Sequence, residues 1–269
     1  MKILLLTGNH PRHLYLADCL SNLGLEIIWV IEKIQEFVPK PDKDLSEDTK
    51  KLFELHFKKR EIAENNFFGN NSGSFAKGKI HSINEINNED LTNGTLKKFC
   101  LSSKADLLLG YGSYKIPNDI LEIPNMKKWN VHLGLSPWYR GVATHFWPSY
   151  LLEPEFTGIT VHEMTDVIDG GPIIHQQLAE LNENDGIHEN ACRLQKSFCD
   201  IFPKKLLKNV KINNDFIGIK QHTSGRNFTA KLWKPEMLKI IYNLFDDQIN
   251  HFCIKNRILR KPILKTILE

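Results

Sequence analysis

Three side chains that can take part in acyl transfer stand close together in the middle of the chain. Asn130 and His132 are two residues apart in WNVHLGLSP (129–137), and Asp169 ends the segment DVID, which Gly170 and Gly171 follow. An amide, and a protonated imidazole, can donate a hydrogen bond to an oxygen that gains negative charge. A carboxylate beside the imidazole favours its protonated form and can accept the proton of an attacking amine, directly or through water. Any one of the three alone is more often a hydrogen-bonded structural residue at a strand end. Together they predict acyl transfer to an amine, without a serine or cysteine nucleophile.

The surrounding pattern predicts the sheet that would position them. Apolar runs predict strands, and amphipathic or longer segments predict helices. The predicted strands are KILLLTG (2–8), LEIIWVIE (25–32), IHSI (80–83), ADLLLGYG (105–112), WNVHLG (129–134), TGITVHEMT (157–165) and PIIHQQLAEL (172–181), and the predicted helices are 13–23, 88–101, 142–153 with a bend at Pro148, and 186–210. This order predicts an α/β fold with a doubly wound, mostly parallel sheet, whose strand carboxyl ends meet at a ligand site. On such a strand Asn130 and His132 point the same way, and the two glycines after Asp169 allow a tight turn.

Two regions depart from this pattern. The charged segment 39–68 predicts a solvated helical insertion, and residues 68–78 have the composition of a flexible loop. Near the carboxyl terminus, an apolar stripe predicts one amphipathic helix over 235–253 that packs on the main domain or forms a dimer face. The stripe consists of Met237, Ile241, Leu244, Phe245, Ile249 and Phe252. We therefore expect a catalytic domain at 1–205 and a small carboxyl-terminal helical extension at 206–269.

Composition excludes several classes of protein. The 269 residues are 41% hydrophobic and 25% charged with a net charge of +3, which is too mild for a dedicated nucleic-acid binder. No apolar run approaches the roughly 20 residues of a membrane helix, and the amino terminus has no signal-peptide cleavage pattern. Five scattered cysteines indicate reduced thiols and a cytoplasmic location. His10 with His13, or His162 with Glu163, lacks a third zinc ligand, so we expect no metal.

Longer motifs in the same region resemble a known family. NVHLGLSPWYRG (130–141) and TGITVHEMTDVIDGGPIIHQ (157–176) resemble the folate-dependent formyltransferases, which act on glycinamide ribonucleotide, methionyl-tRNA or amino sugars. The family motif is Asn-x-His-x-Ser-Leu-Leu-Pro, then Ser/Thr-x-His, then Asp-x-x-Asp-Gly-Gly. The resemblance covers about residues 1 to 205, is strong from about 105 to 180, and implies a Rossmann-like formyltransferase core.

The resemblance also implies roles for individual residues. The family's catalytic triad falls on Asn130, His132 and Asp169, and its second histidine falls on His162. The formyl donor would be 10-formyltetrahydrofolate. Its pteridine would lie against the loop that begins YGSYKIP and against the Asp-x-x-Asp-Gly segment. The residues that the resemblance implies for this contact are Tyr111, Gly112, Ser113, Tyr114, Ile116, Asp166 and Val167.

This sequence departs from the family pattern at one point of the motif. Where the family has Ser-Leu-Leu-Pro, the chain has Gly134-Leu135-Ser136-Pro137, which leaves the triad intact but alters the predicted acceptor pocket. The charged segment 39–68 has no clear counterpart in the minimal family core.

The acceptor amine is less well defined by the sequence. The loop TGNHPRHLYL follows the first strand, and in the glycinamide ribonucleotide branch the equivalent loop holds a phosphate, which suggests Asn9, Arg12 and His13. The pair Arg140-Gly141 and the modest tail are typical of nucleotide-sugar enzymes. Trp138 and Tyr139 would stack on a sugar or base, or would simply pack. We therefore expect a small-molecule acceptor, a nucleotide-linked amino sugar, and no tRNA.

The sequence is also compatible with other functions. Methionyl-tRNA or glycinamide ribonucleotide could be the acceptor, or water could replace the amine, which would make the protein a formyltetrahydrofolate hydrolase. A silent folate- or nucleotide-binding protein is the remaining alternative, and the intact Asn130, His132 and Asp169 argue against it.

Overall fold

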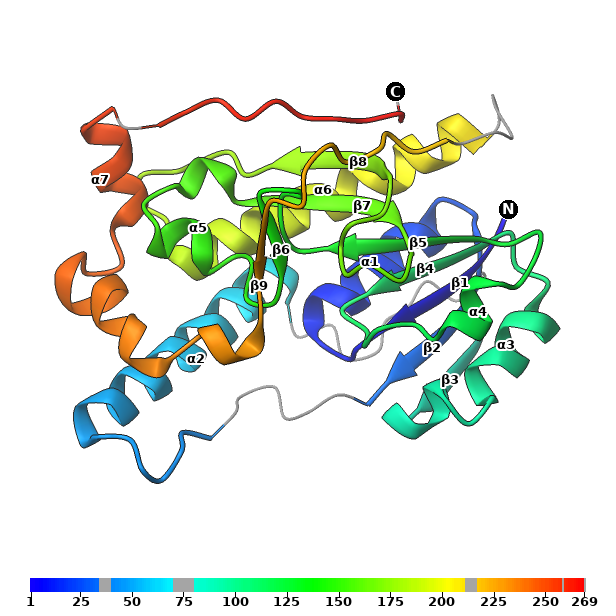
Figure 1. Ribbon diagram of the computed structural model, residues 1–269, viewed down its shortest axis with the longest axis horizontal. Helices are drawn as coiled ribbons and strands as arrows, with labels where there is room; N and C mark the ends of the chain where they lie inside the picture. The colour runs from blue at the N-terminus through cyan, green and yellow to red at the C-terminus, as the bar shows by residue number, and fades with distance from the viewer. Residues whose placement is uncertain (34–39, 70–79, 211–216, 258, 269) are drawn as a thin grey trace.

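A twisted sheet of seven strands forms the centre of the computed structural model (Figure 1), which describes residues 1–33, 40–69, 80–210, 217–257 and 259–268. The strand order is β3-β2-β1-β4-β5-β7-β8. The first five strands along the chain run parallel to their neighbours, whereas β7 is antiparallel to β5 and β8 is antiparallel to β7. The strands are β1 (Lys2–Thr7), β2 (Glu26–Glu32), β3 (Ile80–Ile86), β4 (Leu107–Tyr111), β5 (Lys127–His132), β7 (Gly158–Glu163) and β8 (Ile173–Leu178).

Helices cover both faces of this sheet, as the apolar runs predict. On one face, α1 (Pro11–Asn22) and α6 (Ile187–Val210) bury Leu16, Leu20, Phe198 and Phe202 against the strands. On the other face, α3 (Thr95–Ser103) and α4 (Asn118–Leu121) form a second core cluster, preceded by the 3-10 turn η1 (Asn88–Leu91). The predicted doubly wound, mostly parallel α/β sheet is confirmed.

The charged segment does contain the predicted helix, but the expectation that it is solvated is wrong. Helix α2 (Glu47–Phe68) begins at Ser46, whose Oγ accepts a hydrogen bond from the backbone N–H of Thr49 at 3.3 Å. One face of α2 is buried at Phe53, His56, Ala63, Glu64 and Phe68, a spacing close to the helical period. Lys51, Glu54, Lys58 and Glu61 are exposed on the opposite face. The predicted flexible loop at 68–78 lies, from residue 70 on, outside the described residues.

The predicted helix at 142–153 is much shorter in the structure. Only α5 (Trp147–Tyr150) is helical there, and the 3-10 turn η2 (Pro154–Phe156) follows it. Pro148 lies in the first turn of α5, where its missing N–H costs nothing, so it starts the helix rather than bending it. Ala143 has a positive φ of 54°, which keeps the preceding residues in a turn.

The carboxyl-terminal region is helical but broken. It contains η3 (Ala230–Leu232), η4 (Pro235–Met237), the π-helical turn η5 (Ile240–Leu244) and α7 (Ile249–Lys255). The break falls at Asp246 and Asp247, whose φ angles are 49° and 59°. There the Asp247 carboxylate accepts from Lys59 Nζ at 2.8 Å and from the Ile187 N–H at the start of α6 at 3.0 Å. A tertiary contact therefore interrupts the single helix that we predicted.

The apolar stripe packs on the main body, but only in part. Ile241 and Ile249 are buried in a cluster with Phe53, Leu135 and Tyr139. Leu244, by contrast, keeps 67% of its surface exposed. Leu244 lies in the π-helical turn η5, where residues three apart do not share a face, so it points away from buried Ile241.

The carboxyl-terminal region forms a second, two-stranded sheet and also contacts the main sheet. Strand β9 (Arg226–Phe228) pairs in parallel with β6 (Tyr139–Gly141). The tail lies along β8, where the Ile267 N–H donates to the Ile174 carbonyl at 2.9 Å. The expected domain boundary at residue 205 falls within α6, and the division at that point stays a prediction.

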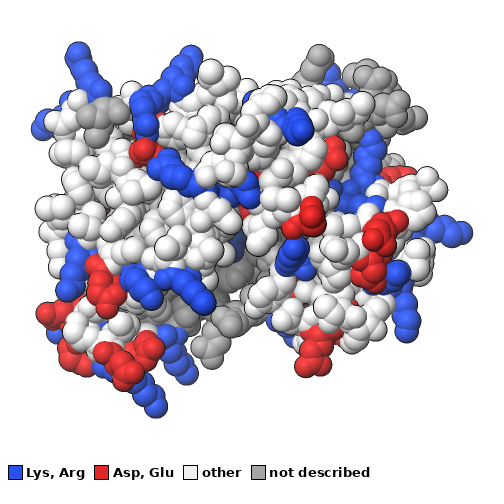
Figure 2. All heavy atoms as spheres, viewed as in Figure 1, with Lys and Arg blue, Asp and Glu red and all other residues white. Residues whose placement is uncertain are grey.

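Charge is spread over the surface. On the face shown in Figure 2, lysine and arginine side chains lie among aspartates and glutamates, in keeping with 35 basic and 32 acidic residues in the chain. Among the described residues, no helix is long and apolar enough to cross a membrane.

We expect Ile241→Ala to lower the free energy of unfolding by about 2–5 kcal/mol, because its side chain is fully buried. Leu244→Ala, in the same stripe, is the matched control and should change it by at most about 0.5 kcal/mol. Urea denaturation of both variants checks this. Equal losses for the two would contradict the broken helix and restore a continuous buried stripe.

Candidate active site

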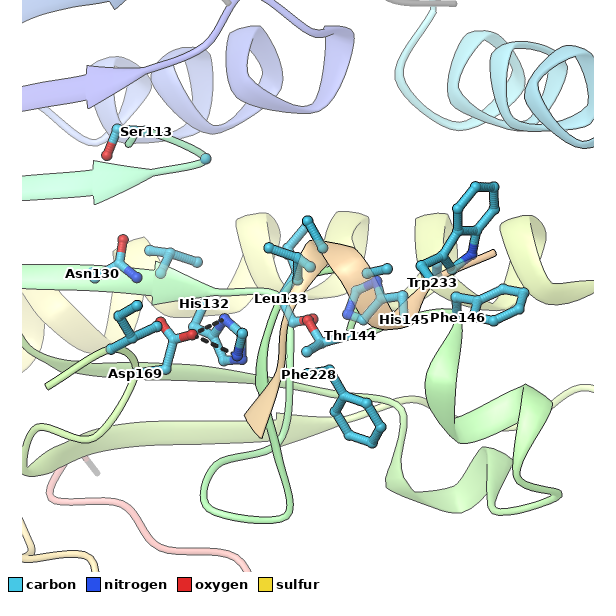
Figure 3. Close-up of a pocket in the computed structure, with 18 of the residues that line it drawn as sticks. Ser113, Asn130, His132, Leu133, Thr144, His145, Phe146, Asp169, Phe228 and Trp233 are labelled. Atoms are coloured by element: carbon cyan, nitrogen blue, oxygen red, sulfur yellow. Dashed lines mark hydrogen bonds and ion pairs between the residues drawn. The ribbon is translucent and has the colours of Figure 1, made fainter. Parts of the chain in front are cut away.

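Strand β5 presents Asn130 and His132 on the same side, as the two-residue spacing predicts. In the sheet, Asn130 lies between Gly110 of β4 and His162 of β7. Its Nδ2 is 3.4 Å from His162 Nε2. The antiparallel direction of β7 thus brings a second imidazole beside the amide. In Figure 3, Asn130, His132 and Asp169 lie together at one part of a pocket.

The Asp169 carboxylate lies between the two imidazoles. Oδ2 is 3.4 Å from His132 Nδ1, and Oδ1 is 3.4 Å from His162 Nε2. The Gly141 N–H donates a further hydrogen bond to Oδ2 at 2.9 Å. The four groups that the sequence singled out by type, Asn130, His132, His162 and Asp169, are therefore brought together.

A set of hydrogen bonds holds the loop that carries Asp169. The residue has a positive φ of 49°, an unfavourable conformation for most residues that needs support from its surroundings. Its carbonyl accepts from Ser136 Oγ at 3.2 Å and from Gln221 Nε2 at 2.9 Å. Arg140 Nε donates to the neighbouring Ile168 carbonyl at 3.0 Å, and its Nη1 donates to the Ser224 carbonyl at 2.8 Å. Arg140 thus clamps this loop to the carboxyl-terminal segment.

Burial and neighbouring charges act in opposite directions on the pKa values of this group. Burial raises the pKa of Asp169, but the adjacent His132 and His162 and the Gly141 N–H outweigh burial and lower it to about 2. The pKa of His132 is lowered by burial, an effect that Asp169 opposes without overcoming. Asp169 thus favours the protonated form of His132, as expected from the sequence, but desolvation of the ring is the larger effect and keeps its pKa below the usual value.

The hydrogen-bond partners of His132 define where it can take up a proton. Its Nε2 lies 2.9 Å from the Tyr139 carbonyl, and because a carbonyl only accepts, Nε2 carries the hydrogen. Neutral His132 then has its lone pair on Nδ1, the atom that faces Asp169. Nδ1 can accept one proton, and the Asp169 carboxylate stabilises the imidazolium that forms. A proton acceptor beside an amide donor suits acyl transfer to an amine.

Gly134 explains the departure from the family motif. A side-chain carbon at this position would overlap His132 Nε2 and the Tyr139 carbonyl, the two atoms of the hydrogen bond just described. With this local backbone, a serine at position 134 would displace the imidazole. The glycine therefore belongs to the way this chain holds His132.

A cavity of about 830 Å³ extends from these groups in two directions. Figure 3 shows Ser113 and Asn130 at one side, His132 in the middle, and His145, Phe146 and Trp233 at the other side. The first side is lined by the loop after β4 and the loop before Asp169. The second is lined by residues of α2, α6 and the segment 227–233.

Most of the residues expected to contact the folate line the first side of the cavity. Gly112, Ser113, Tyr114, Ile116 and Val167 do so. Tyr111 and Asp166 do not. The Tyr111 ring is fully buried, with its hydroxyl donating to Gln195 Oε1 at 3.1 Å. Asp166 is exposed, and its carbonyl accepts from Lys115 Nζ at 2.9 Å.

Only some of the residues expected to bind the acceptor line the cavity. Arg12 and His162 line the cavity, whereas Asn9, His13, Trp138 and Arg140 do not. Asn9 is exposed in the turn before α1. His13 is buried against the Tyr111 ring, with centroids 4.6 Å apart, and Trp138 packs on Phe156 at 5.8 Å. The Arg140 guanidinium instead donates to the Ile168 and Ser224 carbonyls, as described above.

The far wall of the cavity consists of residues that no sequence motif indicated. His56, Arg60 and Glu64 of α2 line it, as do His145, Gln195 and Trp233. The α2 residues are four apart, on one helix face, and this spacing was the available signal. Trp233 lies in a segment without periodicity, so no pattern indicated its position. Among the described residues, no three histidine, cysteine or acidic side chains gather in a way that could hold a metal ion.

Known proteins with similar sequences fall in one family. The formyl transferase family matches residues 58–206, more than half of the 269 residues. Methionyl-tRNA formyltransferase from Prochlorococcus marinus (strain MIT 9312) is 30% identical over 132 residues, which are 48% of this chain and 40% of that protein. The chain thus spans less than half the length of this curated relative.

Solved structures share the fold. A 4-N formyltransferase from Francisella tularensis has a TM-score of 0.53 at 20% identity, covering 86% of this chain and 76% of that chain. The N-formyltransferase from Helicobacter canadensis, solved with folinic acid and dTDP-3-aminofucose, has a TM-score of 0.55 at 19% identity, covering 96% and 82%. At these identities the likeness establishes the architecture alone.

We expect His132 to titrate below 6.5 as the Nε2–H tautomer, because burial lowers its pKa. In Asp169→Asn the pKa should fall further, since the carboxylate that raises it is gone. Long-range ¹H–¹⁵N NMR checks both, with His132→Gln to identify the signals. A pKa above 6.5, or one that rises in Asp169→Asn, would contradict this electrostatic description.

Proposed function

The chain belongs to the formyl transferase family, and from this premise we propose that it moves a formyl group from 10-formyltetrahydrofolate to a primary amine on a nucleotide-linked amino sugar. The observation that carries the proposal is the cluster of Asn130, His132 and Asp169, which lines one continuous cavity. Donor and acceptor can enter such a cavity from opposite sides and meet at these three groups.

The first side of the cavity fits a flat, partly apolar donor. Val167 and Ile168 line it with 49% and 50% of their surfaces exposed, and Ile116 and Met164 lie on the same side. Gly112 has a positive φ of 69°, which turns the backbone of this loop after β4. We propose that these residues hold the pteridine. When bound, 10-formyltetrahydrofolate supplies the activated formyl carbon.

The chain's own groups then have separate tasks. Asn130 Nδ2 donates a hydrogen bond to the formyl oxygen, where negative charge develops as the amine attacks. The amine loses a proton to His132 Nδ1, and Asp169 stabilises the imidazolium that results. His162, which faces both Asn130 and Asp169, keeps the amide and the carboxylate in place. The same proton can then leave His132 for the departing nitrogen of the donor.

The second side of the cavity supports a small hydroxylated acceptor. Phe57, Phe146 and Trp233 provide apolar surface, while Gln195 and Asn227 provide amide groups. Residues of helix α2 also line this end. A mixed aromatic and amide lining suits a sugar derivative better than the end of a tRNA. The similarity to methionyl-tRNA formyltransferases keeps tRNA as the second candidate.

The five cysteines are all free, which supports our proposal of a reducing, cytoplasmic location. We also keep the proposed division into a catalytic part at 1–205 and an extension at 206–269. In that division the extension contributes Asn227 and Trp233 to the acceptor side.

We expect Asp169→Asn to lower turnover by roughly 10²- to 10⁴-fold, because the proton acceptor loses its charged partner. Folate binding should change little. Asp166→Asn, three residues earlier in the same loop and outside the cavity, is the matched control and should keep its turnover. Release of tetrahydrofolate in the presence of acceptor is the measurement. Equal turnover in Asp169→Asn and in the unmodified protein would remove Asp169 from the chemistry.

The acceptor is tested by supplying 10-formyltetrahydrofolate with a panel of amines. The panel holds nucleotide-linked 3- and 4-amino sugars, glycinamide ribonucleotide, charged initiator tRNA and a control without acceptor. We expect a formyl mass increase on one of the amino sugars. Formylation of the tRNA alone would overturn the sugar proposal. Release of tetrahydrofolate in the control, with no formylated amine in any sample, would make the protein a hydrolase.

A further inference from the structure

One buried carboxylate beside the loop after β4 takes no part in the chemistry described above. Glu32 is the last residue of β2, and its side chain is fully buried. Its Oε2 accepts a hydrogen bond from the backbone N–H of Tyr114 at 3.1 Å. Tyr114 belongs to the loop after β4, which lines the side of the cavity proposed to hold the folate. Glu32 is thus in direct contact with the backbone of that loop.

This contact reaches past an intervening strand. In the sheet, β1 lies between β2 and β4, so β2 does not pair with the strand that carries the loop. The pairing of β1 with β4 ends where Thr7 lies opposite Tyr111. Beyond Tyr111, the Glu32 side chain provides the loop with a hydrogen bond that the ladder between these two strands no longer supplies.

The burial of Glu32 is not explained by hydrogen bonds within the core. Its Oε1 is buried and makes no hydrogen bond with any described residue. Burial raises the pKa of Glu32, and the hydrogen bond from Tyr114 opposes this rise without overcoming it. A buried carboxyl group with an unbonded oxygen costs free energy of folding. We therefore look for the role of Glu32 in the loop that it contacts.

The loop needs contacts of this kind because it is largely exposed. Tyr114 and Lys115 both lie on the surface of the cavity and are exposed. Lys115 Nζ donates to the Asp166 carbonyl at 2.9 Å, in the second loop proposed to hold the folate. An exposed loop loses conformational freedom when a ligand orders it. A contact that orders the loop in advance reduces this cost and strengthens binding.

We infer that Glu32 is a positioning residue for the formyl donor: by holding the Tyr114 N–H, it keeps the loop after β4 in the shape that receives the pteridine. This rests on the placement of the pteridine under the proposed function. Glu32 itself does not line the cavity, so it acts through the backbone of Tyr114 and does not touch the donor.

Binding of folinic acid to the intact protein, measured by calorimetry, tests the inference without any acceptor. We expect Glu32→Ala to weaken this binding by about 5- to 30-fold, the equivalent of ordering about one backbone residue. Glu85→Ala is the matched control, with no change expected. Glu85 is an exposed carboxylate at the same end of the neighbouring strand β3, opposite Ile31. Equal binding by the two variants would overturn the inference.

Glu32→Gln separates positioning from a general effect on the fold. Glutamine keeps an acceptor oxygen for the Tyr114 N–H, so it should restore most of the affinity that Glu32→Ala loses. A loss in Glu32→Gln as large as that in Glu32→Ala would contradict the role of this hydrogen bond. Glu32→Met has a similar volume without an acceptor oxygen, and it replaces Glu32→Ala if that variant does not fold.

Formyl transfer provides a second readout. In Glu32→Ala the KM for 10-formyltetrahydrofolate should rise, while turnover at saturating donor stays the same. The reason is that Asn130, His132 and Asp169 keep their places once the donor is bound. A lower turnover with an unchanged KM would mean that Glu32 affects the chemistry, and would overturn the inference.

Val167→Asp distinguishes failure of this inference from failure of the proposed function. Val167 lines the proposed pteridine side from the second loop and is 49% exposed, so a carboxylate there should weaken folinic acid. Weakening by Val167→Asp but not by Glu32→Ala would overturn the inference and leave the pteridine placement intact. Weakening by neither would overturn both. Weakening by Glu32→Ala, with no formyl transfer to any amine, would overturn the proposed function alone.

Discussion

The burial of the Asp169 carboxylate between two imidazoles is the constraint on which the site depends. A buried charge is tolerated only when it is well surrounded by donors or opposite charge. Here the Gly141 N–H and the two histidines provide that environment, and each comes from a different element. β5 must therefore bring His132 to the carboxylate, and β7 must bring His162.

The same constraint ties the carboxyl-terminal segment to the chemistry. Gln221 donates a hydrogen bond directly to the Asp169 carbonyl. The Ser224 carbonyl accepts from Arg140, which in turn binds the loop before Asp169. Gly141 donates to the carboxylate from β6, which is itself paired with β9. A segment that the sequence describes as an appendage is thus part of the support of the acidic group.

Local patterns predicted the sheet and the core of the site because both depend on short-range information. Apolar runs identified the strands, and the two-residue spacing placed Asn130 and His132 on one face. The residues opposite Asn130 and His132 on the next strand depend on the order of the strands in the sheet, which the order along the chain does not define. The family motif predicted His162 as a site residue, and the antiparallel direction of β7 explains why it lies beside Asn130.

Contacts between residues far apart in the chain explain the features that the sequence did not predict. Helix α2 was recognised as a helix, but its charged composition concealed a buried face at His56 and Glu64. The helix predicted over 235–253 breaks because Asp247 reaches Lys59 and the start of α6. The charge of His132 depends on how deeply the ring is buried, which no motif encodes. In each case a partner distant in the chain overrides the local preference.

The pairing of β5 with β7 also limits how this part of the chain can change in length. Asn130 is opposite His162, and His132 is opposite Thr160, whose hydroxyl donates to the Gly134 carbonyl. Inserting or deleting one residue within β7 would reverse which face each following side chain occupies, and the imidazole would move to the far side of the sheet. An insertion that preserves the site must therefore fall in a connection outside the strand pair, and the spacing between Thr160 and His162 is fixed by geometry.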